Sequence, residues 1–542
     1  MLWEESLALF RAEAVHTAFT QESRQGEAAS LGNLGIVYDD LGQYGRAIEF
    51  HQQSLNIARE IGDRQGEATS LSNLGIAYKN LSQYSNAIDF HQQSLDIQRE
   101  IGARQAEGDS LGNLGNAYLL LGQYSDAIDF HQQSLDIAWD VGDRRGAARS
   151  LGSLGTVYSS LGQHGRAGDF ILQSLIIARE IGDRQCDAFS LCNLGWLYSF
   201  FGQYSDAIDF HQQSLGIARE IRHRRSEANT LGYLGTAYSS LGQYARAIDF
   251  HQQSLDIVRE IGDRQGEVSS LGNLGDTHHS LGNYNRAIDF YQQSLGIAQK
   301  IGSLPSEANS LSRLGIVHSS LGDYSRAIDF HQHSLVIAQE IGSLPIKAES
   351  LGNLGNVYYF LGNYLRAIDF HQQAFDIDRE IGDRRGEAAS LVNLGNAYNS
   401  LGEYEHAIDF YQQSLDIARA IGDRQSESFS LHNLGGTFEN LDDLPSAEQH
   451  FQASAHIQES LHSSELSDAN RLSLLDSQQR TYHSWQVTLM DLGQPKAALT
   501  VAERGRAQAL AVSMMRSLDR ETEAFEPPIP LNLQQIQAIA VQ

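Results

Sequence analysis

The sequence predicts an all-α fold built as a solenoid, a row of stacked helix pairs. Leucine recurs every 40 residues from Leu31 to Leu431 without an insertion, which defines eleven copies of one unit between Arg24 and about Ser463. Within each copy, two stretches place apolar or small residues at helical spacing. A single helix pair cannot bury its own apolar face, so neighbouring pairs have to stack and share a continuous core.

Copy one shows how each helix pair is encoded. The first helix carries an apolar face with the spacing i, i+3, i+4 and i+7, made of Leu31, Leu34, Gly35 and Tyr38. The second helix carries the matching face, made of Ala47, Phe50, Ser54, Leu55 and Ala58. The slots of Leu31, Leu34, Gly35 and Ala47 hold the same residue in all eleven copies. Such invariant small residues predict that helix backbones approach each other closely where the helices cross.

Glycine and capping residues predict where the helices end and begin. Gly42 follows the first helix and Gly62 follows the second, as expected for the left-handed residue that often ends a helix. Asp63 is then placed to accept a hydrogen bond from the first free N–H groups of the next helix. In copies eight and nine the same capping slot holds serine, at Ser303 and Ser343.

These residues resemble the tetratricopeptide repeat (TPR) family. The matching positions in copy one are Leu34, Gly35, Tyr38, Gly42, Tyr44 and Ala47, while Leu31 stands where the family usually has tryptophan. The 40-residue unit is longer than the common form. It is similar to the repeats of Pins-type spindle-orientation adaptors and, less closely, of kinesin light chains. The resemblance implies a right-handed TPR α-solenoid whose first helices line a concave groove.

The same register interprets both ends of the sequence. Residues 1–23 keep the spacing of a second helix, with Phe10 in the slot of Phe50, so we expect the second helix of a partial repeat there. Residues 24–463 hold the eleven repeats. Residues 464–515 return to the pattern once, after a slip of 11 residues, as a degenerate last TPR. Its slot residues are Tyr482, Trp485, Leu489, Leu492, Gly493 and Ala498.

The last part of the sequence resembles the region that joins TPR arrays to CHAT domains, which are caspase-like peptidase domains of bacteria. KAALTVAERGRAQAL (496–510) is similar to the last repeat before such domains. Residues 516–542 are interpreted as a linker, with EPPIP at 526–530, and as the start of a CHAT-like domain, with LNLQQIQAIA at 531–540. The Cys–His dyad of that family has no counterpart here, so we expect it downstream of Gln542.

Composition argues against several classes of function. The formal charge is −28 at pH 7, which disfavours a nucleic-acid partner because that binding requires lysine and arginine to neutralise phosphates. The two cysteines, Cys186 and Cys192, form no disulfide framework, and their spacing matches no zinc motif. The sequence shows neither a signal peptide nor an apolar run of about 20 residues for a membrane span. We therefore expect a cytoplasmic protein that binds no cofactor, metal, nucleic acid or membrane.

Histidine recurs at one slot of the second helix, in the motif HQQ. The slot holds His51, His91, His131, His211, His251, His331 and His371, but Ile171, Tyr291, Tyr411 and Phe451 in other copies. A metal ligand or catalytic base does not exchange with isoleucine or phenylalanine, so we interpret this slot as a packing position. No nucleophile elbow, phosphate-binding loop or dinucleotide fingerprint stands out, and we expect no enzyme in this chain.

The predicted groove lies beside the packed face of each first helix. By resemblance, the ligand-facing slots of copy one are Ala29, Gly32, Ile36, Asp39 and Asp40. Across the copies these slots are mostly small or neutral polar, but copy five holds Phe189, Cys192, Trp196 and Phe200, and copy nine holds Tyr359 and Phe360. Aromatic side chains commonly anchor a bound peptide. The alternative is that these rings fold against each other and close a gap left by glycines of neighbouring repeats.

Asparagine occupies one further slot of the first helix in eight copies. The candidate binding residues from this row, and from the position one turn later, are Asn113, Asn116, Asn193, Asn353, Asn356, Asn393 and Asn396. An amide side chain both donates and accepts hydrogen bonds, so it can hold a peptide backbone of any sequence. It can also tie its own repeat to the next one, and the sequence favours neither role over the other.

Two functions follow from the resemblance. The first is a protein-interaction scaffold that binds a peptide or protein segment in its groove, as the sensor or adaptor array of a CHAT peptidase-like bacterial protein. The alternative is a free-standing adaptor similar to Pins-type proteins or kinesin light chains, with no effector domain. A chain with an active site of its own is the least favoured interpretation.

Overall fold

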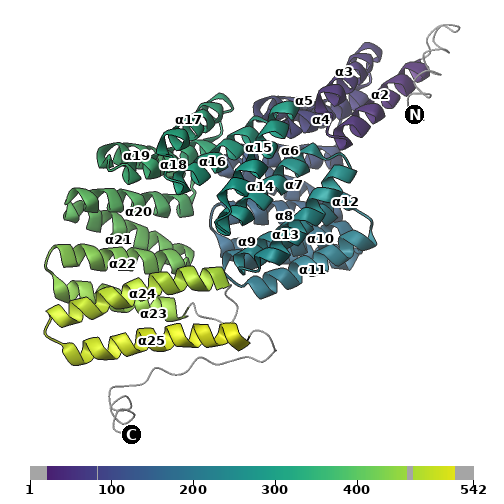
Figure 1. The fold of residues 1–542 in the computed structure, drawn as a ribbon. Coiled ribbons are helices and arrows are strands. Elements are labelled where there is room, and N and C mark those ends of the chain that lie inside the picture. Colours follow the sequence, from purple (N-terminus) through teal and green to yellow (C-terminus); the bar gives the residue numbers. More distant parts are fainter. Residues whose placement is uncertain (1–20, 82, 461–467, 519–542) are drawn as a thin grey trace. The chain divides into compact units, whose positions relative to one another are not determined.

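A computed structural model confirms the all-α fold and the stacked helix pairs (Figure 1). It describes residues 21–81, 83–460 and 468–518. This part of the chain contains 24 helices and no strand. Each of the eleven copies supplies two helices joined by a short turn, and a longer hairpin follows the last copy.

The first helices of the copies have similar lengths. They are α2 (Gln21–Asp40), α4 (Arg64–Asn80), α6 (Arg104–Leu121), α8 (Arg144–Ser160), α10 (Arg184–Phe200), α12 (Arg224–Ser240), α14 (Arg264–Ser280), α16 (Leu304–Ser320), α18 (Leu344–Phe360), α20 (Arg384–Leu401) and α22 (Arg424–Asn440). Residues 21–23 therefore belong to the first helix of copy one. The rest of the predicted partial repeat, residues 1–20, lies outside the described residues.

The second helices alternate with the first. They are α3 (Tyr44–Ile61), α5 (Tyr84–Glu100), α7 (Tyr124–Val141), α9 (His164–Ile181), α11 (Tyr204–Glu220), α13 (Tyr244–Glu260), α15 (Tyr284–Ile301), α17 (Tyr324–Glu340), α19 (Tyr364–Ile381), α21 (Tyr404–Ile421) and α23 (Leu444–Ser460). The final hairpin consists of α24 (Asp468–Asp491) and α25 (Pro495–Leu518).

The chain forms two compact units, each built by stacking of helices. The first unit comprises Met1–Leu197, Asp209–Gly235 and Ile248–Ser350, and the second comprises Tyr198–Ile208, Thr236–Ala247 and Leu351–Gln542. In the first unit, each helix from α2 to α9 packs on the next helix along the chain. In the second unit, the same holds from α19 to α25 (Figure 1).

The core repeats with the sequence. Leu31 and Leu34 are buried, Ala47 is fully buried, and the residues in the same slots of later copies are buried as well. Tyr38 stacks on Phe50 with ring centroids 5.2 Å apart, and copies two, three and four repeat this stacked pair. Each copy thus contributes the same apolar layer, which continues into its neighbours as a solenoid requires.

The invariant glycine of the first helix makes room for a ring. A Cβ added to Gly35 would lie 2.4 Å from Cε1 of His51, and one added to Gly275 would lie 2.3 Å from Cε1 of Tyr291. Sequence analysis predicted a close approach between two helix backbones, and a Cβ added to Gly155 would indeed lie 3.2 Å from the carbonyl oxygen of Ala167. At Gly35 and Gly275, however, the nearest atoms belong to a side chain. The close neighbour is the flat side chain from the histidine slot of the second helix. His51 is fully buried, which agrees with the packing interpretation of this slot.

The turns between helices use left-handed residues as predicted. Gly42 has a φ of +67° and Gly62 a φ of +71°, which glycine adopts without a steric penalty. Two described residues with a side chain also adopt positive φ, Arg222 at +55° and Asp442 at +62°. Both stand in slots that hold glycine in other copies, so the turn geometry is set by the repeat and not by the local residue.

Replacing Arg222 by glycine is expected to stabilise the protein by about 1 kcal/mol, because the left-handed conformation costs a residue with a Cβ about 1–2 kcal/mol. The free energy of unfolding is measured in urea by circular dichroism. The reciprocal variant Gly182→Arg, at the equivalent turn of copy four, is expected to lose a similar amount. An unchanged or lower stability of Arg222→Gly would contradict the prediction.

Capping follows the prediction at aspartate and departs from it at serine. The Asp63 carboxylate accepts a hydrogen bond from the backbone N–H of Gly66 at 2.9 Å. Ser303 takes the same slot before α16, but its side chain makes no capping bond. The Ser303 hydroxyl donates instead to Oγ of Ser306 at 2.9 Å.

The final hairpin continues the core beyond copy eleven. Tyr482, Trp485, Leu489 and Ala498 are buried in one cluster with Phe451 of α23. Gly493, between α24 and α25, has a φ of +71°. The hairpin therefore packs as one more helix pair. The segments 526–530 and 531–540, interpreted from sequence as a linker and the start of another domain, lie outside the described residues.

Candidate functional site

A hollow of about 910 Å³ in the first unit lies along the first helices of copies two to six. Its walls come from α4, α6, α8, α10 and α12, with a single serine from α11. Of the predicted binding residues, Phe189, Cys192 and Asn193 line it from α10, and Asn116 lines it from α6. Trp196, one turn further along α10, is not among the lining residues of this hollow.

The aromatic side chains of α10 are partly packed and partly exposed. Cε1 of Phe189 lies 3.2 Å from the point where a Cβ on Gly152 would stand, so the ring covers a glycine of the preceding repeat. The same side chain remains 49% exposed, and Trp196 remains 42% exposed. Both interpretations made from the sequence therefore describe Phe189, because it closes a gap and still presents a ring surface.

Tyr233 of α12 is a residue of the hollow that sequence analysis missed. It is 44% exposed, and its ring stacks on the buried ring of His211 with centroids 5.6 Å apart. Tyr233 occupies the asparagine slot of copy six. The interruption of the asparagine row by an aromatic residue was the signal that would have identified it.

Phe200 has a different environment from Phe189, which is the aromatic residue of α10 that lines the hollow. It lies in the part of the chain that belongs to the second unit. The guanidinium of Arg385 stands 4.7 Å from the centre of its ring, and Phe201 contacts it edge-on with centroids 5.8 Å apart. The sequence therefore groups Phe200 with Cys192 by slot, whereas in the structure a cation–π contact holds it.

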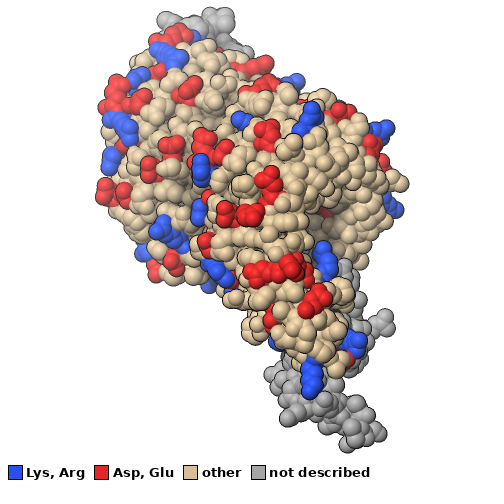
Figure 2. Space-filling view, turned by 90° about the vertical axis from the view of Figure 1, so that its left-hand side faces the viewer, with Lys and Arg blue, Asp and Glu red and all other residues tan. Residues whose placement is uncertain are grey.

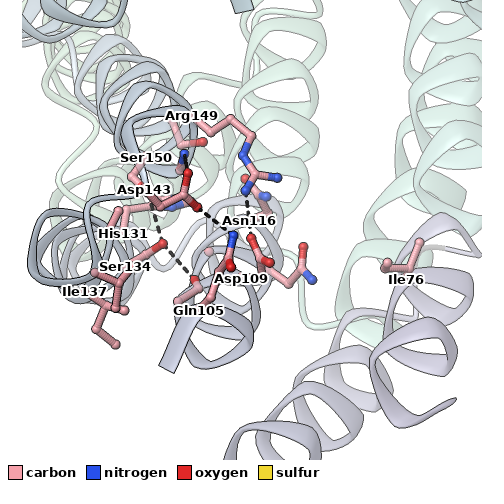
Figure 3. A pocket seen from close by; sticks show the side chains of 17 residues that line it. Ile76, Gln105, Asp109, Asn116, His131, Ser134, Ile137, Asp143, Arg149 and Ser150 are labelled. Carbon is pink, nitrogen blue, oxygen red and sulfur yellow. Dashed lines mark hydrogen bonds and ion pairs between the residues drawn. The ribbon is translucent and has the colours of Figure 1, made fainter. Parts of the chain in front are cut away.

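A smaller pocket of about 300 Å³ adjoins α6 and α8 and is lined by both amides of copy three, Asn113 and Asn116 (Figure 3). Arg149 forms an ion pair with Asp109 at 2.7 Å beside it. The amide of Gln105 donates to a carboxylate oxygen of Asp143 at 3.3 Å. This pocket is thus polar, in contrast to the aromatic wall at Phe189.

The asparagine row ties repeats together at some positions and lines a pocket at others. Asn193 donates to the hydroxyl of Thr156 in the preceding copy at 3.4 Å. Asn433 donates to the side-chain oxygen of Asn396 at 3.3 Å, and the hydroxyl of Tyr411 donates to the same oxygen at 2.7 Å. Asn193 and Asn396 therefore make inter-repeat contacts, Asn113 and Asn116 line a pocket, and Asn193 has both roles because it also lines the hollow.

The predicted patch of copy nine lies on α18 and α20 in the second unit. Tyr359 shares a hydrogen bond with the hydroxyl of Ser400 at 3.1 Å, and Phe360 is 62% exposed. The two rings meet edge-on with centroids 5.9 Å apart. Asn353 and Asn356 belong to α18, and Asn393 and Asn396 to α20.

Comparison with protein families matches one family, described as tetratricopeptide repeat, over residues 26–100, 66–140, 146–220, 226–300, 306–380 and 386–460. The chain belongs to the tetratricopeptide repeat family. As an array of such repeats, it is a protein-interaction scaffold.

Two solved structures are similar to this TPR chain. BtubC (BKLC) from P. vanneervenii is 19% identical, with a TM-score of 0.36 over 41% of this chain and 91% of that one. A Rap protein complexed with competence and sporulation factor is 15% identical, with a TM-score of 0.45 over 66% of this chain and 99% of that one. No curated protein sequence matches the chain.

The two helices of copy five bring together a cysteine and a histidine that are 19 residues apart in sequence. Sγ of Cys192 lies 3.9 Å from Nδ1 of His211, a pairing that the sequence did not indicate. Burial raises the pKa of the Cys192 thiol to about 12 and lowers the pKa of His211 to about 4. A neutral thiol beside a neutral imidazole is not the activated thiolate that cysteine enzymes use. This pair is packing and not a nucleophile with its base.

Charged side chains around the hollow are mostly in ion pairs. Arg145 binds Asp183 at 2.6 Å, in addition to the pair between Arg149 and Asp109. Lys79 is half-buried, and burial lowers its pKa while the nearby Asp39 acts in the opposite direction. Figure 2 shows acidic and basic side chains interspersed across one face of the molecule.

Other classes of site were sought over the described ranges. Residues 21–81, 83–460 and 468–518 contain no group of three or more His, Cys, Asp or Glu side chains placed to hold a metal ion. In the same part of the chain, no helix combines the length and the apolar character that crossing a bilayer requires.

Proposed function

We propose that the hollow along copies two to six binds an extended segment of a protein partner. The observation that carries this proposal is its lining. Half-exposed rings of Phe189 and Tyr233 line the same hollow as the amides of Asn116 and Asn193. Aromatic anchors next to amides are what a peptide needs, because the rings bury its side chains and the amides bond its backbone.

The extent of the hollow sets the length of the bound segment. Packed helices lie about 10 Å apart, so the four steps from α4 to α12 span about 40 Å. At about 3.3 Å per residue, this length takes about twelve residues of extended chain. The proposed contacts in the hollow are Phe189, Cys192, Asn193 and Asn116, with Tyr233 added and Trp196 retained as a candidate by its slot. Asn113 is proposed as a contact in the adjoining smaller pocket. Phe200 is retained as a separate candidate in the second unit. A second patch is proposed at Asn353, Asn356, Tyr359, Phe360, Asn393 and Asn396.

The test begins by selecting binders from a library of random twelve-residue peptides on the purified protein. The Kd values of the selected peptides are then measured by fluorescence anisotropy. The double variant Phe189→Ala/Tyr233→Ala is expected to weaken binding at least about tenfold, since anchor side chains contribute more than about 1.4 kcal/mol together. Trp196→Ala tests separately whether that ring is an anchor.

The matched control is Trp139→Ala. Trp139 is an aromatic residue that is 50% exposed on the second helix α7 and does not line the hollow. Circular dichroism verifies that each variant keeps its helix content. Equal affinity of the double variant and of Trp139→Ala would contradict the proposed groove.

We further propose that this scaffold is the sensor or adaptor array of a CHAT peptidase-like bacterial protein. Support comes from the sequence resemblance of 496–510 and 531–540 and from the packing of the hairpin at 464–515 as one more helix pair. On this proposal, 1–23 is part of a repeat, 24–463 is the array and 516–542 leads into the effector domain. Reading the coding frame past Gln542 tests it. Absence of a caspase-like Cys–His domain there, in this frame or after a frameshift, would contradict the proposal.

A further inference from the structure

Six copies of the repeat share an ion pair in which copy seven has a lysine in place of the carboxylate. In copies one to six the arginine at the start of the first helix binds the carboxylate near the end of the second helix. The pairs are Arg24–Glu60, Arg64–Glu100, Arg104–Asp140, Arg144–Glu180, Arg184–Glu220 and Arg224–Glu260. In copy seven the arginine is Arg264, and the carboxylate position holds Lys300. Two cations therefore stand where every earlier copy has a cation and an anion.

The nearby carboxylates engage Arg264 but leave the added positive charge of Lys300. One guanidinium nitrogen of Arg264 binds Glu267 at 2.6 Å, and Arg259 binds the other oxygen of the same carboxylate at 2.7 Å. Asp263, the residue before α14, binds Arg225 at 2.9 Å and caps the helix through Gly266. Both nearby carboxylates are therefore already engaged, and Lys300 adds a positive charge beside them.

A cavity of about 630 Å³ opens at this place, where the turn of copy one approaches the start of α14 within the first unit. A Cβ on Gly42 would lie 3.6 Å from the carbonyl oxygen of Gly262, so the two turns are close neighbours. Arg46, at the start of α3, brings a third cation to the lining. Among the described residues, no aspartate or glutamate lines the cavity, although the whole chain has 67 of them against 39 lysines and arginines.

The lining of this cavity also has an apolar part. Leu41, Tyr44, Leu81 and Ile301 provide apolar surface beside the three cations. A site with three cations and no carboxylate attracts a multiply charged anion, and arginine forks match the oxygen geometry of a phosphate. The apolar side chains suit a carbon-containing group attached to that anion.

We infer that Arg46, Arg264 and Lys300 form a binding site for the phosphate group of a phosphorylated compound. The anion takes the place of the carboxylate that copies one to six supply from their own second helix. This site is separate from the proposed peptide hollow, which is lined by other residues. Its ligand also joins copy one to copies six and seven, so binding is expected to stabilise the folded protein.

The test uses pyrophosphate as the free probe and vesicles of phosphatidylcholine with phosphatidic acid as the lipid probe. Thermal unfolding and titration calorimetry measure the former, and vesicle sedimentation measures the latter. Lys300→Glu restores the residue found at this slot in most earlier copies, so it is expected to fold and to raise Tm without ligand. It is also expected to weaken phosphate binding at least about tenfold, because an attraction becomes a repulsion.

Lys496→Glu is the matched control, since it makes the same charge change at an exposed residue of α25 outside the cavity. The site is supported if pyrophosphate or the vesicles bind, if Lys300→Glu abolishes this binding and if Lys496→Glu retains it. The probe that binds then identifies the source of the phosphate group. Binding of neither probe, or equal loss in both variants, overturns the inference. Peptide affinity measured on Lys300→Glu stays unchanged if the two sites are independent.

Discussion

Replacing Gly315 by alanine is expected to destabilise the protein by about 1–3 kcal/mol, the range seen when a methyl group is forced into a packed core. The new Cβ would lie 2.4 Å from Cε1 of His331, which is buried and has no free space to move into. The free energy of unfolding is measured in urea by circular dichroism. The invariant glycine is thus expected to be required by the ring opposite it, and not by the helix backbone.

Two comparisons isolate the cause of that loss. Gly216→Ala on α11 is the matched control, because nothing lies within 4 Å of the added Cβ, and it is expected to stabilise by about 1 kcal/mol through helix propensity. In a His331→Ala background, Gly315→Ala is expected to lose its penalty, since the ring is gone. A Gly315→Ala variant as stable as Gly216→Ala would contradict the packing account.

Lowering the pH from 7 to 4 is expected to destabilise the array through the histidine slot. Burial lowers the pKa of His91 to about 3 and that of His131, His211, His251, His331 and His371 to about 4, against 6.5 for an exposed histidine. These groups therefore stay largely neutral in the folded state until the pH approaches 4. Below pH 6.5 the unfolded chain binds protons that the folded chain does not, so the free energy of unfolding falls as pH falls towards 4.

The size of the acid effect follows from the shift. A pKa difference of about 2.5 corresponds to about 3 kcal/mol for each histidine at full effect, from 1.36 kcal/mol per unit. The triple variant His131→Phe/His251→Phe/His331→Phe removes three of these groups and keeps a ring, as Phe451 does naturally. Its stability is expected to decline less than that of the wild type between pH 7 and pH 4.5, as measured by urea midpoints.

Carboxylates that titrate in the same range are common to both proteins, so the difference between them reports the histidines. Burial raises the pKa of Glu107 and Glu267, but their arginine partners lower it by more, so that both pKa values are lowered. The wild type and the triple variant lose these ion pairs alike as the pH falls. His456→Asn, at an exposed histidine of α23, serves as the control. Parallel pH profiles of the wild type and the triple variant would rule out the buried histidines as the source.

The repeated part of the fold was predictable from sequence because its information is local. The slots of Leu31, Gly35, Ala47 and Gly42 recur at fixed spacing, and each acts within one copy or between adjacent copies. Helix positions and left-handed turns therefore followed from one repeat applied eleven times. The histidine slot was also interpreted correctly as packing, because its exchange with isoleucine and phenylalanine is visible in the sequence.

Prediction of the candidate site was incomplete because neighbours across repeats decide it. Phe189 and Cys192 were identified by slot, but Tyr233 was missed and Trp196 does not line the hollow. A slot alone does not specify which rings share one surface. That depends on side-chain packing between copies, as the ring of Phe189 over Gly152 and the ring of Tyr233 over His211 show.

The sequence by itself determined that this protein is an array of helix pairs, with the same core layer in each copy and few charges along the predicted groove. Only the tertiary structure decided which distant residues meet, such as the turn at Gly42 with that at Gly262. The physical reason is that each repeat encodes its own packing through short-range spacing. Contacts between copies that are far apart in sequence depend instead on small rotations that accumulate from one repeat to the next.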